Sequence, residues 1–215
     1  MTAADVIKLI DYTADVFHDA RGLLSSLDRD IGDGDHGVAM DVGWAAVRSA
    51  VHQLEQPRLS DVFRAAGDAF LDKVGATVGP LYATMFLAIG KLVRGKDVLT
   101  DGDVGPIFRI AVESLQKRGK ANVGDKTMMD VWIPALQAFQ ENERKGLQAA
   151  ALAAATAGRS GAERTKDMVA LKGRASYLGQ RSVGHVDPGA QSALILLESV
   201  IEWIRAKEGE ADAGR

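Results

Sequence analysis

Cysteine is missing from this sequence of 215 residues, which excludes disulfide bonds, thiolate catalysis and zinc sites built from cysteine. Basic residues are not in excess, because 26 Lys and Arg stand against 29 Asp and Glu, and no basic stripe is interleaved with aromatic side chains. Long apolar runs are missing as well, and the first residues lack the basic-then-apolar order of a secretory signal. We therefore expect a cytoplasmic protein whose partners are neither nucleic acids nor membranes.

The residues that are present repeat with helical periodicity nearly throughout the chain. Thr2 with Asp5 and Thr100 with Asp103 have the spacing of capping boxes, and apolar residues follow each pair at helical intervals. No window shows the sustained alternation of a strand. The pattern predicts an all-α fold with one domain over residues 1–207 and a frayed tail over 208–215. The eight expected helices begin near residues 2, 37, 60, 80, 100, 127, 147 and 190.

Two of these expected helices have an unusual composition. Pro134 lies deep inside the sixth helix, where it predicts a kink or an early break. The seventh helix, expected over residues 147–158, is nearly all alanine from Ala149 to Ala155. Alanine favours helix and has little bulk, so this run indicates close helix packing rather than a flexible linker.

The most informative stretch is Asp28-Arg-Asp-Ile-Gly-Asp33-Gly-Asp35-His36-Gly37, which lies between the first two helical patterns. Three aspartates held this closely repel one another unless a cation neutralises them, and hard oxygen ligands favour Mg²⁺ or Ca²⁺. An EF-hand is excluded, because its fifth and twelfth positions would be Gly32 and Ala39. The other interpretation is a solvated acidic loop, since Asp-Gly pairs are ordinary turn formers.

Four longer connections, over residues 28–37, 75–80, 119–126 and 172–190, follow the first, third, fifth and seventh expected helices. In a bundle with short links, alternate loops fall at the same end, so these four loops are expected to meet at one rim. Their chemistry fits a phosphate ligand: carboxylates, glycine turns, the Thr77 hydroxyl, lysines and Arg174. Taken singly, each loop has an ordinary structural explanation, because glycine turns connect helices and lysines are usually solvated.

The chain is similar to the DhaL family, the nucleotide-binding subunits of dihydroxyacetone kinase. The matching segments, in chain order, are Leu27-Asp28-Arg-Asp-Ile-Gly-Asp33-Gly-Asp35-His36-Gly37, Gly79-Pro80-Leu81-Tyr82, Arg118-Gly119-Lys120-Ala121, Gly124-Asp125-Lys126-Thr127-Met128, Lys172-Gly173-Arg174-Ala175-Ser176-Tyr177-Leu178-Gly179 and Asp187-Pro188-Gly189-Ala190. One segment departs from the pattern, because Gly75-Ala76-Thr77-Val78-Gly79-Pro80 stands where the family commonly has Gly-Gly-Ala-Ser-Gly-Pro. Val78 therefore replaces a serine hydroxyl.

The resemblance implies an antiparallel eight-helix barrel with ADP or ATP at one end and two Mg²⁺ ions held by Asp28, Asp33 and Asp35. It further implies that Arg174 stabilises charge during phosphoryl transfer. The nucleotide-binding residues that it implies are His36, Gly37, Val38, Ala39, Thr77, Val78, Gly119, Met128, Arg174, Asp187, Pro188 and Gly189.

The expected function is phosphoryl transfer to dihydroxyacetone or a related short ketose such as erythrulose. The resemblance implies that a DhaK-type subunit holds the ketose. It allows two phosphoryl donors: exchanging ATP, or bound ADP that a DhaM-type phosphotransferase subunit recharges. The alternative is a non-catalytic regulatory module that binds nucleotide together with a transcription factor or another partner.

Overall fold

The computed structural model describes the backbone of residues 1–213 and the side chains of residues 1–207. Its α-helices are α1 (Ala3–Ile31), α2 (His36–His52), α3 (Leu59–Lys73), α4 (Val78–Leu92), α5 (Asp101–Gly119), α6 (Met129–Asn142), α7 (Leu147–Arg164) and α8 (Pro188–Ala213). Three 3₁₀ segments, η1 (Glu143–Lys145), η2 (Thr165–Asp167) and η3 (Arg174–Ser182), lie in the connections. Residues 1–213 contain no strand, so the expected all-α fold is confirmed.

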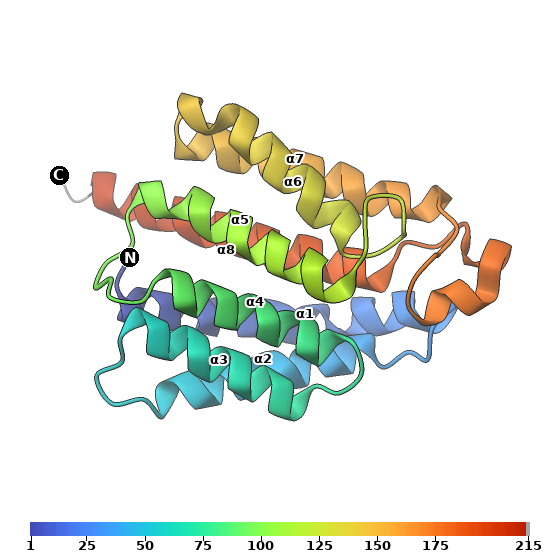
Figure 1. Cartoon of the computed structure of the whole chain (residues 1–215), viewed down its shortest axis with the longest axis horizontal. Coiled ribbons are helices and arrows are strands. Elements are labelled where there is room, and N and C mark those ends of the chain that lie inside the picture. Colours follow the sequence, from blue (N-terminus) through green and yellow to red (C-terminus); the bar gives the residue numbers. More distant parts are fainter. Residues whose placement is uncertain (214–215) are drawn as a thin grey trace.

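The eight helices form a closed antiparallel ring (Figure 1). Each helix packs against the next along the chain, and α8 packs against α1 to complete the circle. The α1–α2, α3–α4, α5–α6 and α7–α8 connections lie at one end of the barrel, at the right of Figure 1, whereas the N-terminus lies at the other end. We call the end with these four connections the rim and the opposite end the base. Alternate loops thus share an end, as the parity of the helices predicts.

The structure corrects several expected details. Pro134 does not end α6, which continues to Asn142. Proline removes the hydrogen bond that the Asp130 carbonyl would accept, and α7 covers that carbonyl closely, since a Cβ on Gly161 would lie 2.0 Å from the oxygen. Helix α7 extends to Arg164, and α8 begins at Pro188 and extends to Ala213, past the expected end at residue 207. Residues 214 and 215 and the side chains from 208 onward lie outside the description, so the fraying of 208–215 stays a prediction.

The two halves of the ring fill the core differently. In the first half, Trp44 of α2 stacks on Phe17 at a centroid distance of 5.4 Å and meets Phe70 and Phe86 edge-on at 6.2 and 5.7 Å. Aromatic rings prefer these arrangements, and they fill the space between the first four helices. In the second half, the buried face of α7 consists of alanine and glycine. Small side chains let α7 approach α6 and α8 closely, as the alanine-rich run predicts.

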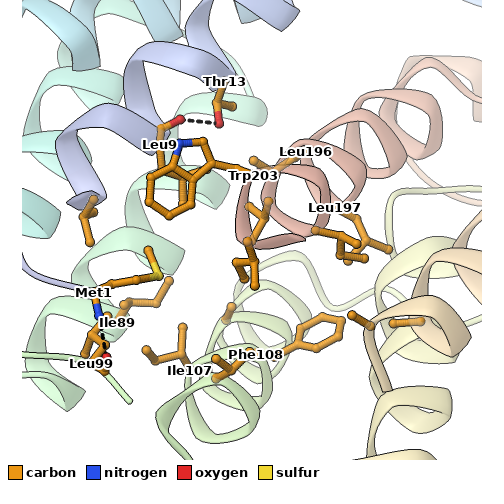
Figure 2. Close-up of a pocket in the computed structure, with 18 of the residues that line it drawn as sticks. Met1, Leu9, Thr13, Ile89, Leu99, Ile107, Phe108, Leu196, Leu197 and Trp203 are labelled. Carbon is orange, nitrogen blue, oxygen red and sulfur yellow. Dashed lines mark hydrogen bonds between the residues drawn. The ribbon is translucent and has the colours of Figure 1, made fainter. Parts of the chain in front are cut away.

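The interior of the barrel toward the base contains an apolar cavity of about 370 Å³ (Figure 2). Side chains from α1, α4, α5 and α8 line it, among them Leu9, Ile89, Phe108 and Leu197. Met1 lies at its edge, where the terminal ammonium group donates a hydrogen bond of 2.6 Å to the Leu99 carbonyl. Across residues 1–213, no helix has both the length and the apolar character to span a membrane.

Candidate nucleotide and metal site at the rim

All four rim connections contribute residues to one cavity of about 240 Å³. The α1–α2 connection contributes Asp28, Asp33, Asp35 and His36, and the α3–α4 connection contributes residues 76–78. The α5–α6 connection contributes Gly119, Ala121 and residues 126–129, and the α7–α8 connection contributes residues 172–175 and 187–189. Segments far apart in the sequence therefore share one site, as expected of a composite ligand-binding rim.

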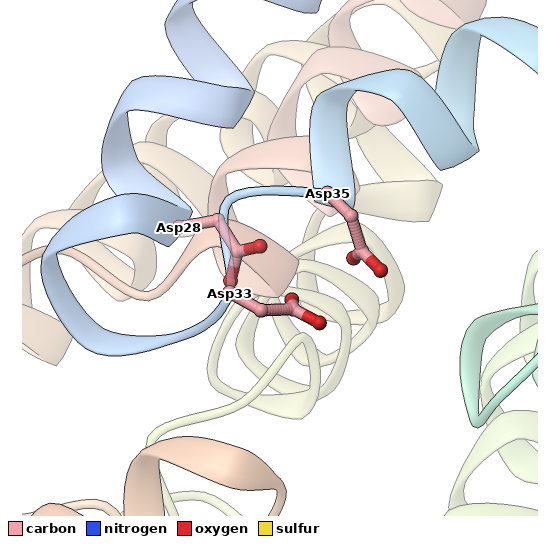
Figure 3. Close-up of side chains that lie close together, drawn as sticks. All are labelled: Asp28, Asp33 and Asp35. Carbon is pink, nitrogen blue, oxygen red and sulfur yellow. The ribbon is translucent and has the colours of Figure 1, made fainter.

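Three carboxylates form an acidic cluster on one side of this cavity (Figure 3). One oxygen each from Asp28, Asp33 and Asp35 lies within 4.8 Å of the others. Asp28 belongs to the last turn of α1 and is buried, and it accepts a hydrogen bond of 3.1 Å from the His36 backbone amide at the start of α2. Asp33 and Asp35 are exposed. The arrangement fits a magnesium site, because hard oxygen ligands converge while the exposed side remains open to water and phosphate oxygens.

Arg174 is paired with the acidic cluster. Its guanidinium group contacts the Asp33 carboxylate and lies 3.8 Å from an Asp35 oxygen. Arg174 is the first residue of η3 and follows Gly173, whose φ of +64° favours glycine. The resemblance implied a phosphate-facing arginine, and the structure places this arginine against the carboxylates that border the same cavity. The guanidinium group is therefore within the site and half-exposed.

The start of α4 borders the cavity with backbone amides and small side chains. Thr77 is the N-cap residue but its hydroxyl accepts no bond from the helix, and Val78 begins the helix. Gly79 is required here, since a Cβ would lie 1.8 Å from the Val74 carbonyl oxygen. Ala76 has a φ of +53°, a strained conformation for a residue with a Cβ. This start is therefore a compact turn that brings backbone N–H groups to the cavity.

The start of α8 is organised by Asp187. Its carboxylate accepts a hydrogen bond of 2.8 Å from the Ala190 amide, and Pro188 occupies the first helical position, where proline is favoured. The Asp187 amide donates to the Thr165 hydroxyl at 3.0 Å, which joins the two ends of the α7–α8 connection. Burial raises the pKa of Asp187 to about 7, although the Ala190 amide and Lys126 oppose that shift.

His36 is buried in the wall of the site and hydrogen-bonded there. Its Nε2 lies 3.0 Å from the Ser192 hydroxyl, and that hydroxyl donates to the Gly189 carbonyl, also at 3.0 Å. Burial lowers the pKa of His36, while Asp28 and a backbone hydrogen bond with Pro188 act in the opposite direction. The imidazole therefore links α2 to the start of α8.

Three of the expected nucleotide-binding residues do not line the cavity. Gly37 is buried against α1, where a Cβ would lie 2.1 Å from the Arg21 carbonyl oxygen. Val38 is exposed, and Ala39 is packed against the core. The remaining expected residues all lie along the cavity, and their roles remain predictions: Asp28, Asp33, Asp35, His36, Thr77, Val78, Gly119, Met128, Arg174, Asp187, Pro188 and Gly189.

Lys126 lies in a loop expected to offer cations but is not among the expected site residues. This lysine lines the cavity with only 1% of its surface exposed, whereas lysines in such loops are usually solvated. Its ammonium group donates to the backbone carbonyls of Thr165 and His185. Because those acceptors are backbone atoms far away in the sequence, no local pattern indicated the contact.

Comparison with known proteins agrees with this architecture. A family model described as the DAK2 domain matches residues 30–202. The PEP-dependent dihydroxyacetone kinase 1, ADP-binding subunit DhaL, of Listeria innocua is 42% identical over 181 residues, which cover 84% of this chain and 86% of the relative. The PEP-dependent dihydroxyacetone kinase, ADP-binding subunit DhaL, of Escherichia coli is 33% identical over 210 residues, which cover 97% and 99%.

A solved structure has the same arrangement of helices. The dihydroxyacetone kinase from C. freundii, in complex with AMP-PNP and Mg²⁺, superposes with a TM-score of 0.70 at 27% sequence identity. The match covers 93% of this chain and 34% of that longer one. With the extended family match and two relatives above 30% identity over most of their length, the chain belongs to the DAK2 domain family, together with the DhaL-type subunits of dihydroxyacetone kinases.

Proposed function

We propose that this chain is the nucleotide-binding subunit of a dihydroxyacetone or related short-ketose kinase, with its nucleotide at the rim. The observation that carries the proposal is the acidic cluster of Asp28, Asp33 and Asp35 in a cavity that also holds helix starts and Arg174. Carboxylates, backbone amides and an arginine around one cavity are the groups that a metal-bound polyphosphate requires. The regulatory alternative has no comparable support, since the reported relatives are named as kinase subunits.

In this proposal, each group around the cavity has its own role in phosphoryl transfer. Asp28, Asp33 and Asp35 would hold two Mg²⁺ ions, which when bound would offset the negative charge of the phosphate oxygens. Arg174 would donate to a phosphate oxygen from the same side of the cavity, and the amides at the start of α4 would hold the phosphate chain. The protein thus contributes positioning and electrostatic stabilisation rather than a covalent step.

The acceptor is proposed to arrive on a separate ketose-binding subunit of the DhaK type. The segment that carries Arg174 also has exposed apolar side chains, with Tyr177 90% exposed and Leu171 60% exposed, close in sequence to residues 172–175 that line the cavity. A bulky exposed aromatic beside a transfer site is suited to a protein contact. We expect Tyr177→Ser to weaken productive docking about tenfold, measured as a higher concentration of the ketose subunit at half-maximal rate, without changing Mg-ADP affinity.

The donor is proposed to be bound ADP that a phosphohistidine-carrying subunit of the DhaM type recharges, because both reported DhaL relatives are named as PEP-dependent. The opposing possibility is ATP that exchanges freely. Val78, which stands where the family commonly has serine, removes a hydroxyl from the phosphate turn and would act in favour of exchange. We place this chemistry in the cytoplasm.

Native mass spectrometry of the purified chain, before and after EDTA, tests the nucleotide site. Retained ADP with two magnesium ions, both lost on chelation, would support a permanently bound nucleotide and a recharging partner. An empty chain that binds Mg-ATP reversibly would favour exchange, and Val78→Ser would then be expected to slow nucleotide release. No nucleotide binding under either condition would refute the proposed site.

A coupled assay with the ketose-binding subunit tests the enzymatic role separately. Phosphorylated dihydroxyacetone or erythrulose should form with the wild type and not with Asp33→Ala. Binding of both nucleotide and partner without any phosphorylated ketose would favour the regulatory alternative.

A further inference from the structure

Lys126 is a buried cation at the back of the rim cavity. It lies in the α5–α6 connection with 1% of its surface exposed and a φ of +59°, in the left-handed region that a lysine rarely adopts. Removing an ammonium group from water is costly unless hydrogen bonds and opposite charges compensate. The structure must therefore provide specific partners for this side chain, and their positions indicate its role.

The partners are the two ends of the α7–α8 connection. The Lys126 ammonium group donates to the Thr165 carbonyl and to the His185 carbonyl, both at 2.5 Å. Thr165 directly follows α7, and His185 lies two residues before Asp187, the residue that caps α8. One side chain thus joins the beginning and the end of the segment over residues 165–187, which contains Arg174.

Further contacts hold the segment where Lys126 joins it. The Leu171 amide donates to the carbonyl of Asp125, the residue before the lysine, at 3.1 Å, and the Gly184 amide donates to the Lys166 carbonyl at 2.7 Å. The loop of Lys126 is itself fixed, because the Asp130 carboxylate accepts from the Gly124 amide at 2.6 Å and from the Thr127 amide at 2.7 Å. These hydrogen bonds therefore hold the backbone that carries Lys126 in place.

Burial and nearby carboxylates act in opposite directions on the pKa of Lys126, and the effect of burial is the larger. Burial lowers the pKa of Lys126, while Asp187 of the α8 start, Asp130 of α6 and Asp167 of η2 act in the opposite direction. A positive charge strengthens hydrogen bonds to carbonyl oxygens, so both contacts are stronger than neutral ones.

We propose that Lys126 is a positioning residue for phosphoryl transfer: its ammonium group fastens both ends of the 165–187 segment to the α5–α6 connection and thereby fixes Arg174 beside Asp33 and Asp35. This inference rests on the proposed nucleotide site, since Arg174 has a role only if phosphates bind there. The Lys126 side chain is fully buried, but both hydrogen bonds that its ammonium group donates go to the 165–187 segment and neither goes to a helix of the ring. In a methionine variant the buried chain is retained while these two bonds are lost. Loss of Lys126 should therefore loosen the segment more than the barrel.

Amide hydrogen exchange on the full-length, nucleotide-free protein tests the fastening directly. In Lys126→Met, amides over residues 168–184 should exchange at least about tenfold faster than in the wild type, while the helices of the first half keep their protection. Lys120→Met is the matched control, because Lys120 is an exposed lysine of the same connection with a similar φ of +50°. It should leave exchange over 168–184 unchanged.

Kinetics with the ketose-binding subunit test the consequence for transfer. Lys126→Met should lower kcat at least about tenfold at a temperature where it is fully folded, whereas Mn²⁺ binding to the acidic cluster, followed without nucleotide, should stay within about twofold. Lys126→Arg retains a charged donor and should recover part of kcat and of the protection. A role in folding alone would lower the melting temperature and leave kcat unchanged.

The outcomes separate this inference from the nucleotide site itself. If the wild type binds no Mg-ADP, the proposed site fails, while the exchange data still decide whether Lys126 fastens the segment. Unchanged exchange over 168–184 in a folded Lys126→Met variant would overturn the inference. Failure of both the Met and Arg variants to fold would overturn it too, because Lys126 would then be a requirement of the whole fold.

Discussion

Three helix starts at the base of the barrel differ from one helix start at the rim in how their backbone amides are satisfied. At the base, α1, α3 and α5 each have an aspartate in the first turn whose carboxylate accepts the N-cap amide, with distances of 2.8 Å for Asp5, 3.2 Å for Asp61 and 2.8 Å for Asp103. At the rim, Asp28 accepts the first amide of α2 and Asp187 caps α8, but the N-cap residue Thr77 of α4 provides no side-chain cap. The base thus neutralises the starts of α1, α3 and α5 within the protein, whereas the rim leaves the start of α4 for a ligand.

Backbone strain follows the same division. Four residues other than glycine have a positive φ in the described chain, and Ala76, Lys120 and Lys126 of these lie in rim connections, with Gln56 at the base. Strained conformations persist where the surrounding structure enforces them, and they concentrate at functional sites. Substitutions at the base should therefore affect stability, and substitutions at the rim should affect binding and turnover.

The largest expected effect comes from the acidic cluster. Asp33→Asn should reduce ketose phosphorylation at least about 100-fold, because a metal ligand is lost. The melting temperature of the metal-free variant should stay the same or rise. The substitution removes repulsion between like charges, and the exposed ion pair with Arg174 that it breaks contributes little to stability. Asp30→Asn, which changes a neighbouring exposed carboxylate outside the cluster, should retain activity. Equal losses in both variants would contradict a specific metal site.

The next effect is on the pH dependence of stability in metal-free protein. The folded pKa of Asp187 is raised to about 7 from an ordinary 3.8, so the folded state keeps a proton that the unfolded chain has released. The contribution of this raised pKa to the free energy of unfolding is complete below pH 4. It is lost as the pH rises to 7, with a slope of up to about 1.4 kcal/mol per pH unit. Urea denaturation across this range should show a flatter profile for Asp187→Asn, which keeps a capping side chain. Parallel profiles would contradict the raised pKa.

A smaller effect is expected at the base. Asp5→Ala should lower the free energy of unfolding by about 1 kcal/mol, because it removes the carboxylate of a capping box. The Asp5 pKa is lowered to about 2, first by the Lys207 hydrogen bond and then by Thr2, so this contribution should be lost as the pH falls from 4 to 2. Calorimetric Mg-ADP affinity should not change. A loss of affinity would show that the base and the rim are coupled.

The smallest effect separates strain from function within the rim. Ala76→Gly should raise the free energy of unfolding by about 0.5 kcal/mol, because relief of the left-handed conformation exceeds the entropy that glycine adds to the unfolded chain. Gly75→Ala is the control, since its Cβ would meet open space and Gly75 does not need a positive φ. Thermal denaturation of both variants tests this. A loss of stability in Ala76→Gly would mean that the alanine methyl group packs favourably.

The fold, and the meeting of the four loops at one cavity, could be predicted from the sequence because both follow from regular physics. Helical periodicity fixed the helix count, and the parity of short connections placed the loops that hold Asp33, Thr77, Gly119 and Arg174 at one end. The spacing of Asp28, Asp33 and Asp35 indicated a cation site from charge alone, and the structure brings their oxygens within 4.8 Å. These features depend on short-range patterns that a sequence carries explicitly.

The remainder depends on contacts between distant segments. Lys126 is buried because two carbonyls of another connection accept hydrogen bonds from it, and Arg174 pairs with Asp33 of another connection. The direction in which Val38 points depends on how α2 rotates against α1, which sequence proximity to His36 does not determine. Helix α6 continues past Pro134, and the Asp130 carbonyl that the proline frees lies against Gly161 of α7, a contact that the local sequence does not indicate.

The closure of the ring between α8 and α1 has a consequence for engineering. The Tyr12 hydroxyl donates to Glu202 at 2.9 Å, and Lys207 reaches Asp5, so the first and last helices are neighbours like any other pair. A circular permutant with a flexible linker between the old termini and new termini in the exposed turn at Glu55 would keep every helix contact and all four rim connections. Such a chain would present its new termini at the base, leaving the rim free for a tethered partner.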